Sequence, residues 1–183
     1  MGAYDHPMAH VVLLRGVNVG GHRTFRPTVL CAQLEHLDVV NIGAAGNFVV
    51  RAPIARAELR AEFARRLPFE TEIVICMGRE IARIAAHDRF ADERPSPDIV
   101  RFVSVLSRAP RRAPTTSVTL PPRGRWMLRI LAVEGRFVFG LYRRQMKAIG
   151  YLGALDDRFG VPVTTRSWST ITAIARVLAN TKP

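Results

Sequence analysis

The sequence predicts an α/β (α+β) protein of two lobes with mainly antiparallel sheets, and three observations lead to this prediction. Short apolar runs bounded by glycine or proline alternate with helical patterns along the chain. Residues 9–90 follow the order strand, helix, strand, strand, helix, strand, and residues 99–183 repeat it less clearly. Between them, residues 91–98, "ADERPSPD", hold two prolines and several charges, which is typical of a linker. The order βαββαβ is that of ferredoxin-like folds.

The first lobe begins with a strand at residues 10–17, because "HVVLLRGV" is short, apolar and stopped by glycine. Pro27 suits the first position of a helix whose leucines then recur at helical spacing. The segment "VVNIGAAGNFVVRA" reads as two short strands around a glycine-rich turn, which indicates a hairpin. A second helix starts near Ala55, "ETEIVICM" forms the fourth strand, and a third helix covers about residues 79–86.

The second lobe starts with the strand "IVRFVSVLS", followed later by the hairpin "WMLRILAVEGRFVFGLY". A helix near residues 149–159 and the short strand "PVTTR" come next. Ser167 is a good N-cap for a last helix, in which Trp168 belongs to an apolar stripe and is expected in the core. Residues 107–125 contain four prolines, so we expect a long loop there instead of a full crossover helix.

Three segments resemble a known family: "VVLLRGVNVGG" at 11–21, "AAGNFVV" at 44–50 and "VPVTTRSWSTITAIARVL" at 161–178. In order and spacing they are similar to the bacterial family called domain of unknown function 1697, from about residue 9 to residue 178. The resemblance implies two ferredoxin-like lobes. It implies no activity, because the family is defined by sequence and has no established biochemistry.

The chain also departs from the family pattern at several polar positions. This chain has Ala44-Ala45 where the family usually has Gln-Ser, and Ser167 and Ser169 where it has two asparagines. It has Ala173 in place of a lysine, and Gln145-Met146-Lys147 in place of a Ser-Lys-Leu-like run. A binding or structural role tolerates such changes more easily than catalysis does.

The net charge of +12 lies entirely in the second half of the chain. Residues 1–98 carry 12 arginines and 12 acidic residues, whereas residues 99–183 carry 15 basic residues and only three acidic ones. Such asymmetry points to an anionic partner, which is nucleic acid, a phosphorylated ligand or a membrane surface. The alternative is a codon-biased genome, since the chain has 25 arginines and two lysines, but this bias does not explain the missing acids.

The glycine-rich stretch "GVNVGGHRT" is not a P-loop, because His22 stands at the lysine position and Arg23 at the Ser/Thr position. It is either a turn that leaves the first strand or an anion site built on backbone N–H groups. The topology places this loop and the turn before Asn47 at one end of the sheet. The candidate anion ligands of the first lobe are Arg15, Asn18, Gly20, Gly21, His22, Arg23 and Asn47. For the asparagines, the alternative is that they cap turns through their own hydrogen bonds.

In the second lobe the same reasoning sorts the basic side chains to two ends of the sheet. The candidates near one end are Arg111, Arg112 and Arg166, and those nearer the other end are Arg143, Arg144 and Lys147. Arginine clusters favour phosphate through their charge and forked donors, and a solvated basic face is the alternative. The first strand has no aromatic residue to stack on bases, so any nucleic acid is expected to bind through its phosphates.

Other classes of site find little support in the sequence. No histidines or cysteines have metal-ligand spacing, no G-x-S-x-G elbow is present, and neither metal nor cofactor is expected. The two cysteines belong to no C-x-x-C pair and fit small buried residues, which favours a cytoplasmic location. No apolar run approaches the roughly 20 residues that a membrane span needs.

These observations favour an anion-binding protein over an enzyme. A small-molecule enzyme with its site between the lobes, drawing on Arg15, Asn18, His22, Asn47 and Arg166, is the first alternative. A self-associating structural protein, forming a homo-oligomer through exposed sheet faces, is the second.

Overall fold

The computed structural model describes residues 9–18, 20–111 and 117–180, which form two compact units. Unit 1 holds the residues up to His87 together with those from Thr170 onward, and unit 2 is Asp88–Ser169. The last helix, α6 (Trp168–Ala179), therefore continues from unit 2 into unit 1. Sequence reasoning assigned it to the second lobe. Its later turns instead pack in unit 1, where Leu178 lies against Gly78. A Cβ added at Gly78 would lie 3.0 Å from Cδ2 of Leu178.

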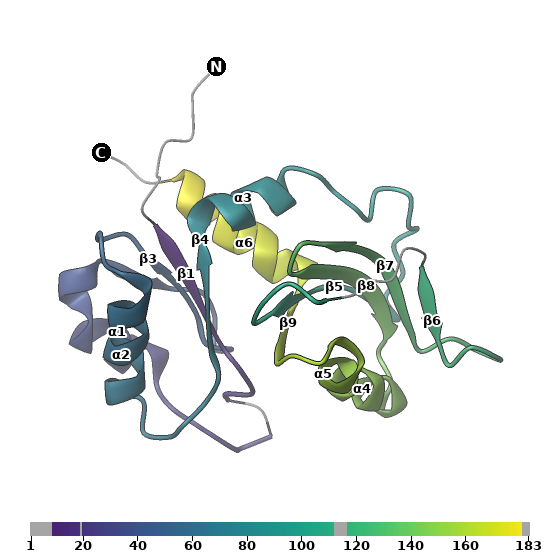
Figure 1. The fold of residues 1–183 in the computed structure, drawn as a ribbon, viewed down its shortest axis with the longest axis horizontal. Coiled ribbons are helices and arrows are strands. Elements are labelled where there is room, and N and C mark those ends of the chain that lie inside the picture. The colour runs from purple at the N-terminus through teal and green to yellow at the C-terminus, as the bar shows by residue number, and fades with distance from the viewer. Residues whose placement is uncertain (1–8, 19, 112–116, 181–183) are drawn as a thin grey trace. The chain divides into compact units, whose positions relative to one another are not determined.

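Unit 1 has the predicted order of elements (Figure 1). These are β1 (His10–Leu14), α1 (Pro27–Gln33), a 3₁₀ turn (Glu35–Leu37), β2 (Val39–Asn41), β3 (Asn47–Val50), α2 (Arg56–Arg66), β4 (Ile73–Met77) and α3 (Gly78–Ala85). The sheet order is β2-β3-β1-β4, with each neighbouring pair antiparallel. This is the strand order of a ferredoxin-like lobe.

Helices α1 and α2 cover one face of this sheet (Figure 1). Leu30 of α1 and Phe63 of α2 pack with Val12 and Phe48 of the sheet in one buried cluster. The rings of Phe48 and Phe63 meet edge to face with centroids 5.3 Å apart. Each fully buried side chain of this size stabilises the fold by about 1.5–3 kcal/mol. Of the three periodic leucines that predicted the first helix, Leu30 lies in α1, whereas Leu34 ends it and Leu37 lies in the 3₁₀ turn; all three are buried in this cluster.

Unit 2 repeats the arrangement, except that its described residues hold no helix after the first strand and include one added strand. Its elements are β5 (Ile99–Leu106), β6 (Val118–Leu120), β7 (Leu128–Glu134), β8 (Phe137–Arg143), α4 (Met146–Gly153), α5 (Leu155–Phe159) and β9 (Val163–Ser167). The antiparallel sheet has the order β6-β7-β8-β5-β9. Strands β7-β8-β5-β9 reproduce the order of unit 1, so the second lobe is also ferredoxin-like, as predicted.

The local differences from prediction in unit 2 have simple physical causes. The proline-rich stretch after β5 has no helix in its described part, as expected, but it adds β6, which pairs with β7 at the sheet edge. The single helix predicted near residues 149–159 is two helices, broken at Ala154. Two glycines in the last turns of α4 weaken helix continuation there.

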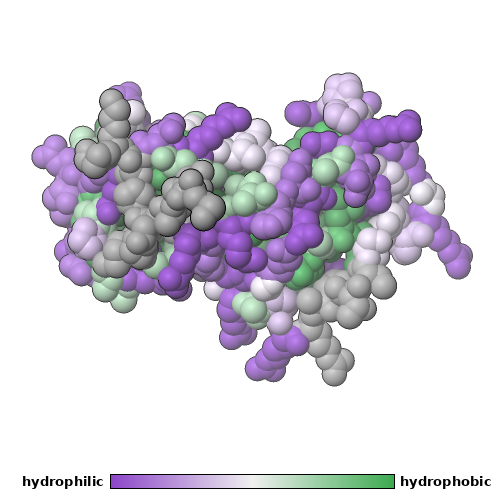
Figure 2. Space-filling model, turned by 90° about the horizontal axis from the view of Figure 1, so that it is seen from above, coloured by the Kyte–Doolittle hydropathy of each residue, from purple (hydrophilic) through white to green (hydrophobic). Residues whose placement is uncertain are grey.

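Most of the surface visible in Figure 2 is hydrophilic, with apolar residues showing between the polar ones. None of the helices in the described ranges is long and apolar enough to cross a bilayer.

Candidate functional site

Five of the described residues in the glycine-rich loop of unit 1 have a left-handed backbone conformation. Gly16, Asn18, Gly20, Gly21 and Arg23 all have positive φ, between 48° and 77°. For Asn18 and Arg23, which carry a Cβ, this conformation costs free energy that the surrounding contacts must offset. The two central glycines have the positive φ angles that the sequence predicted for leaving strand β1.

Asn18 joins this loop to the β2–β3 turn, as the predicted topology requires. Its Nδ2 donates to the carbonyl oxygen of Ala44 at 2.7 Å, and its Oδ1 accepts from the backbone N–H of Phe25 at 2.9 Å. The turn itself needs Gly46, because a Cβ there would lie 2.7 Å from Val17 and its φ is +71°. The two segments thus share one end of the sheet.

Asn18 and Asn47 act here as turn caps, which is the alternative that the sequence left open. Asn47 donates from Nδ2 to the carbonyl of Ile42 at 3.0 Å, across its own turn. Arg15 is anchored through its backbone, whose carbonyl accepts from Thr71 Oγ1 at 2.6 Å. His22 and Arg23 are exposed. These contacts explain the conformation of the loop without any bound ligand.

The strand register separates Arg111 from Arg143 and Arg144, but Arg166 pairs with Val103 in the middle of β5, away from the end predicted for it. Arg143 pairs with Ile99 at the start of β5, whereas Arg108 and Arg111 follow the other end of that strand. Arg111 and Arg108 line a depression of about 560 Å³ that also holds Asp157. Arg112 lies outside the described residues, and Lys147 is exposed on α4.

Two of the candidate arginines are packed against other groups of the protein instead of being exposed to a ligand. Arg143 donates from Nε to the carbonyl of Trp126 at 2.9 Å and lies over that indole, 4.3 Å from its centroid. Arg166, on β9, is only 8% exposed and donates to the carbonyl of Thr165. Burial lowers the pKa of Arg166 to about 10. Since Arg166 belongs to unit 2 while the loop candidates belong to unit 1, the grouping predicted for an inter-lobe enzyme site draws on both units.

Phe90, the residue before the segment 91–98 predicted as a linker, packs in unit 2, and Glu93 of that segment contacts the unit 2 sheet. Phe90 is fully buried, with its ring 6.2 Å from that of Phe139 and 5.3 Å from that of Trp168. Glu93 accepts from Arg129 through its carboxylate, and from Arg101 through its carbonyl oxygen at 2.5 Å. The carboxylate of Glu93, which precedes position 99, therefore neutralises part of the charge that the sequence placed in the second lobe.

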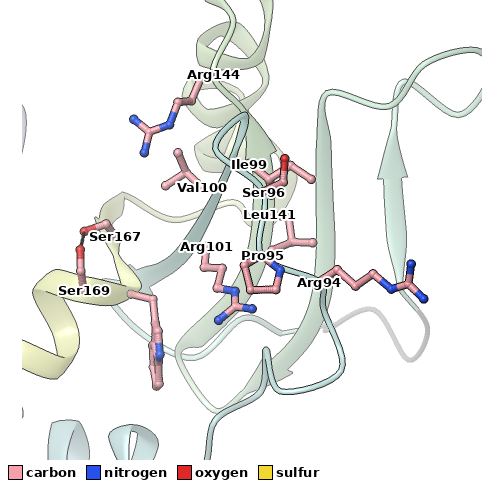
Figure 3. A pocket seen from close by; sticks show the side chains of 11 residues that line it. Arg94, Pro95, Ser96, Ile99, Val100, Arg101, Leu141, Arg144, Ser167 and Ser169 are labelled. Carbon is pink, nitrogen blue, oxygen red and sulfur yellow. Dashed lines mark hydrogen bonds between the residues drawn. The ribbon is translucent and has the colours of Figure 1, made fainter.

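A pocket of about 300 Å³ opens beside this segment, entirely within unit 2 (Figure 3). Its polar side chains come from the segment before β5, from β5, from the end of β8 and from the junction of β9 with α6. The lining residues are Arg94, Pro95, Ser96, Ile99, Val100, Arg101, Leu141, Arg144, Ser167, Trp168 and Ser169. We call this the serine–arginine pocket.

The two serines and two of the arginines shape this pocket. The hydroxyls of Ser167 and Ser169 are 2.9 Å apart, on one side in Figure 3. Arg101 extends along the opposite side, with its guanidinium 5.9 Å from the ring of Phe90. Arg144 is held by a bond from its Nε to the carbonyl of Pro97 at 2.9 Å, whereas the Arg94 guanidinium points away from the other side chains.

Sequence reasoning found only Arg144 among these residues as a site candidate. Trp168, predicted for the core, is half-buried and lines the pocket at the first turn of α6. The signal that could have found the site is the departure from the family pattern at Ser167 and Ser169, on either side of an aromatic residue. Arg101 carried no signal, because its neighbours are set by the fold.

Comparison with known proteins places the chain in a family. A family model described as "Protein of unknown function (DUF1697)" matches residues 8–127. The chain belongs to this family. A solved structure, that of the conserved bacterial protein SP0830 from Streptococcus pneumoniae, is similar in fold with a TM-score of 0.62 and 14% sequence identity. The similarity covers 94% of this chain and 99% of that one. No curated protein matched the sequence.

Cysteine and metal chemistry add nothing further to the site. Cys76 is fully buried in β4, and Cys31 packs against the unit 1 core, where burial raises the pKa of its thiol. Within the described ranges, no three His, Cys, Asp or Glu side chains gather closely enough to hold a metal ion.

Proposed function

We propose that this protein binds a small phosphorylated ligand in the serine–arginine pocket. The observation that carries the proposal is the composition of the pocket: three arginines and three serines line it, and none of the eleven described lining residues is acidic. Guanidinium and hydroxyl groups are strong donors to phosphate oxygens.

The position of the serines adds to this chemistry. Ser167 and Ser169 flank the first residue of α6, a helix of 12 residues. Backbone N–H groups in the first turn of a helix lack intrahelical partners and favour an anion. Trp168 adds an aromatic surface beside these donors, so a ligand that carries both a phosphoryl group and a ring fits the lining best.

A small ligand is favoured over nucleic acid because the basic residues do not form a continuous track. Arg111 and Arg144 lie at opposite ends of the unit 2 sheet, and Arg143 is packed against Trp126. A volume of about 300 Å³ is at the lower end of the range for small-molecule sites. The described lining holds no histidine or carboxylate to act as a general base, so the proposal is for binding and not for catalysis.

The direct test is calorimetric titration with inorganic pyrophosphate and with adenosine monophosphate. Arg144→Met and the double variant Ser167→Ala/Ser169→Ala remove donors, and Arg125→Met is the matched control, since Arg125 is exposed on unit 2 away from the lining. A charge-assisted hydrogen bond contributes about 1.5–3 kcal/mol, so each pocket variant should weaken binding roughly 10- to 100-fold while the control binds as the parent does.

Two results would overturn the proposal. One is the absence of saturable binding by either anion. The other is equal weakening by Arg144→Met and by Arg125→Met, because that result would assign the binding to overall charge. Stronger retention of the parent protein on single-stranded polynucleotide than on either small anion would favour nucleic acid instead.

A further inference from the structure

Unit 1 contains a second concave surface, between helices α3 and α6. It has a volume of about 690 Å³ and is lined by residues of these two helices, with Ala86 just after α3. Figure 1 shows the helices next to each other, and Leu178 of α6 touches Gly78 at the first position of α3. We call this surface the α3–α6 groove.

Both helices present the same pattern to the groove. Two sets of four residues line it, Arg79, Ala82, Arg83 and Ala86 along α3 and Thr172, Ala175, Arg176 and Ala179 along α6, and Gly78, Ala85 and Leu178 complete the lining. Each set has the spacing i, i+3, i+4, i+7, which is one face of a helix. The opposite faces carry the isoleucines that are buried in the protein, among them Ile81, Ile84, Ile171 and Ile174. Most groove positions therefore lie apart from these isoleucines, although Gly78 and Leu178 both line the groove and hold the two helices together.

The floor of the groove is made of small residues and its rim is positive. Ala82 and Ala175 are half-buried, whereas Arg79, Arg83 and Arg176 are exposed. The nearest acidic residue on α3 is Glu80, whose carboxylate accepts from the backbone N–H of Met77 at 2.7 Å and caps the helix. None of the described lining residues is acidic.

We infer that the α3–α6 groove binds an amphipathic helix of a partner protein, with an apolar stripe flanked by acidic side chains. Small residues on two adjacent helices let a third helix approach to about 8–10 Å, the usual packing distance. The eight residues of α3 span two turns, about 12 Å, so two to three turns of the partner would fill the groove.

The positive charge of the groove favours an acidic partner helix over a second copy of this chain. A partner with glutamates beside its apolar stripe would face Arg79, Arg83 and Arg176, and the arginines would draw it into register. A second copy of this chain presenting the same groove would set these arginines against one another. The complementarity therefore favours a different, acidic chain over self-association.

The test uses two synthetic helical peptides that share one leucine stripe at i, i+3, i+4 and i+7. In one peptide the flanking positions are glutamate, and in the other they are lysine. Fluorescence anisotropy of the labelled peptides measures binding to the full chain. We expect the glutamate peptide to bind at least tenfold more tightly than the lysine peptide.

The variants locate the binding surface. Arg79→Glu/Arg176→Glu should reverse the preference between the peptides, and Ala175→Leu should weaken the glutamate peptide at least tenfold by filling the floor. The matched control is Arg123→Glu/Arg125→Glu, two exposed arginines of unit 2, which should change neither affinity. All these substitutions except Ala175→Leu are at exposed positions, and far-UV circular dichroism of each variant verifies that it is folded.

Several outcomes would overturn the inference. It fails if neither peptide binds, or if the control pair weakens binding as much as the groove pair. Saturable binding of oleate or of anionic vesicles, lost in Ala175→Leu while neither peptide binds, would assign the groove to a lipid. Self-association in sedimentation that Arg79→Glu/Arg176→Glu abolishes would assign it to a second copy. None of these measurements involves the serine–arginine pocket, so the two proposals can fail separately.

Discussion

Gly140 lies in the middle of β8, under the ring of Phe102, and its replacement by alanine tests the packing of unit 2. A Cβ at this position would be 2.5 Å from the carbonyl oxygen of Arg129 and 2.5 Å from Cζ of Phe102. An ordinary contact is at 3.4–4 Å, so both neighbours are far too close. The carbonyl belongs to the backbone of β7, and Phe102 is fully buried, so neither can swing aside.

The expected cost follows from these two contacts. Overpacking of a buried site destabilises by about 1–3 kcal/mol, and two simultaneous clashes place Gly140→Ala at the upper end of that range. The lower backbone entropy of alanine in the unfolded chain returns about 0.5–1 kcal/mol. The net loss for unit 2 is therefore about 2 kcal/mol.

Urea unfolding followed by tryptophan fluorescence measures this loss, because both tryptophans, Trp126 and Trp168, belong to unit 2. The matched control is Gly150→Ala in α4, where a Cβ meets nothing within 4 Å and should stabilise by about 0.5–1 kcal/mol. Adding Phe102→Leu should relieve one clash, so the double variant should lose less than the sum of the single losses. Equal midpoints for the two alanine variants, or strict additivity with Phe102→Leu, would refute the packing described here.

Three further predictions follow from burial. Phe90→Ala should destabilise unit 2 by about 3–5 kcal/mol in the same urea assay, whereas an effect within about 0.5 kcal/mol would contradict the burial of Phe90 in unit 2. The pKa of His10 is lowered by burial and by Arg56, so the unfolded chain takes up a proton first as the pH falls below about 6.5. As the pH falls below about 6.5, the free energy of unfolding should fall in the parent and less steeply in His10→Phe. The same slope in both proteins would assign the lost stability to other groups. His87→Phe, at an exposed site, is the control. Because burial raises the pKa of Cys31, its reaction with an aromatic disulfide at pH 8 should be slower in the native protein than in urea, and equal rates would contradict its placement.

The elements that the sequence predicted well are those whose signal is local. Strand β1 is a histidine followed by four aliphatic residues, all buried, and the turn at Gly46 needs a backbone that only glycine adopts easily. The strand order then follows from the sequence of elements. Asn18 meets the β2–β3 turn for the same reason, and that contact was predictable without coordinates.

The elements that were not predicted depend on contacts between distant parts of the chain. Residues 91–98 have the composition of a linker, but Phe90 just before them is fully buried on the unit 2 sheet. Helix α6 follows the second lobe in sequence, yet its later turns belong to unit 1. The serine–arginine pocket joins Arg101, Arg144 and Ser167, three positions that no short-range spacing connects. Only the antiparallel register, which was not available from the sequence, brings them together.

The arginine excess was the strongest functional signal in the sequence, and the structure changes how it should be interpreted. Arg143 and Arg129 lie over the ring of Trp126, Arg101 lies over Phe90, and Arg166 is buried in β9. Long side chains of this kind bury their stems along apolar surface, so part of the positive charge serves packing. The net charge includes every arginine equally, whereas only an arginine that lies beside a cavity and other hydrogen-bond donors can hold a ligand. For this reason our proposal of an anion site rests on the composition of a single pocket and not on the total of +12.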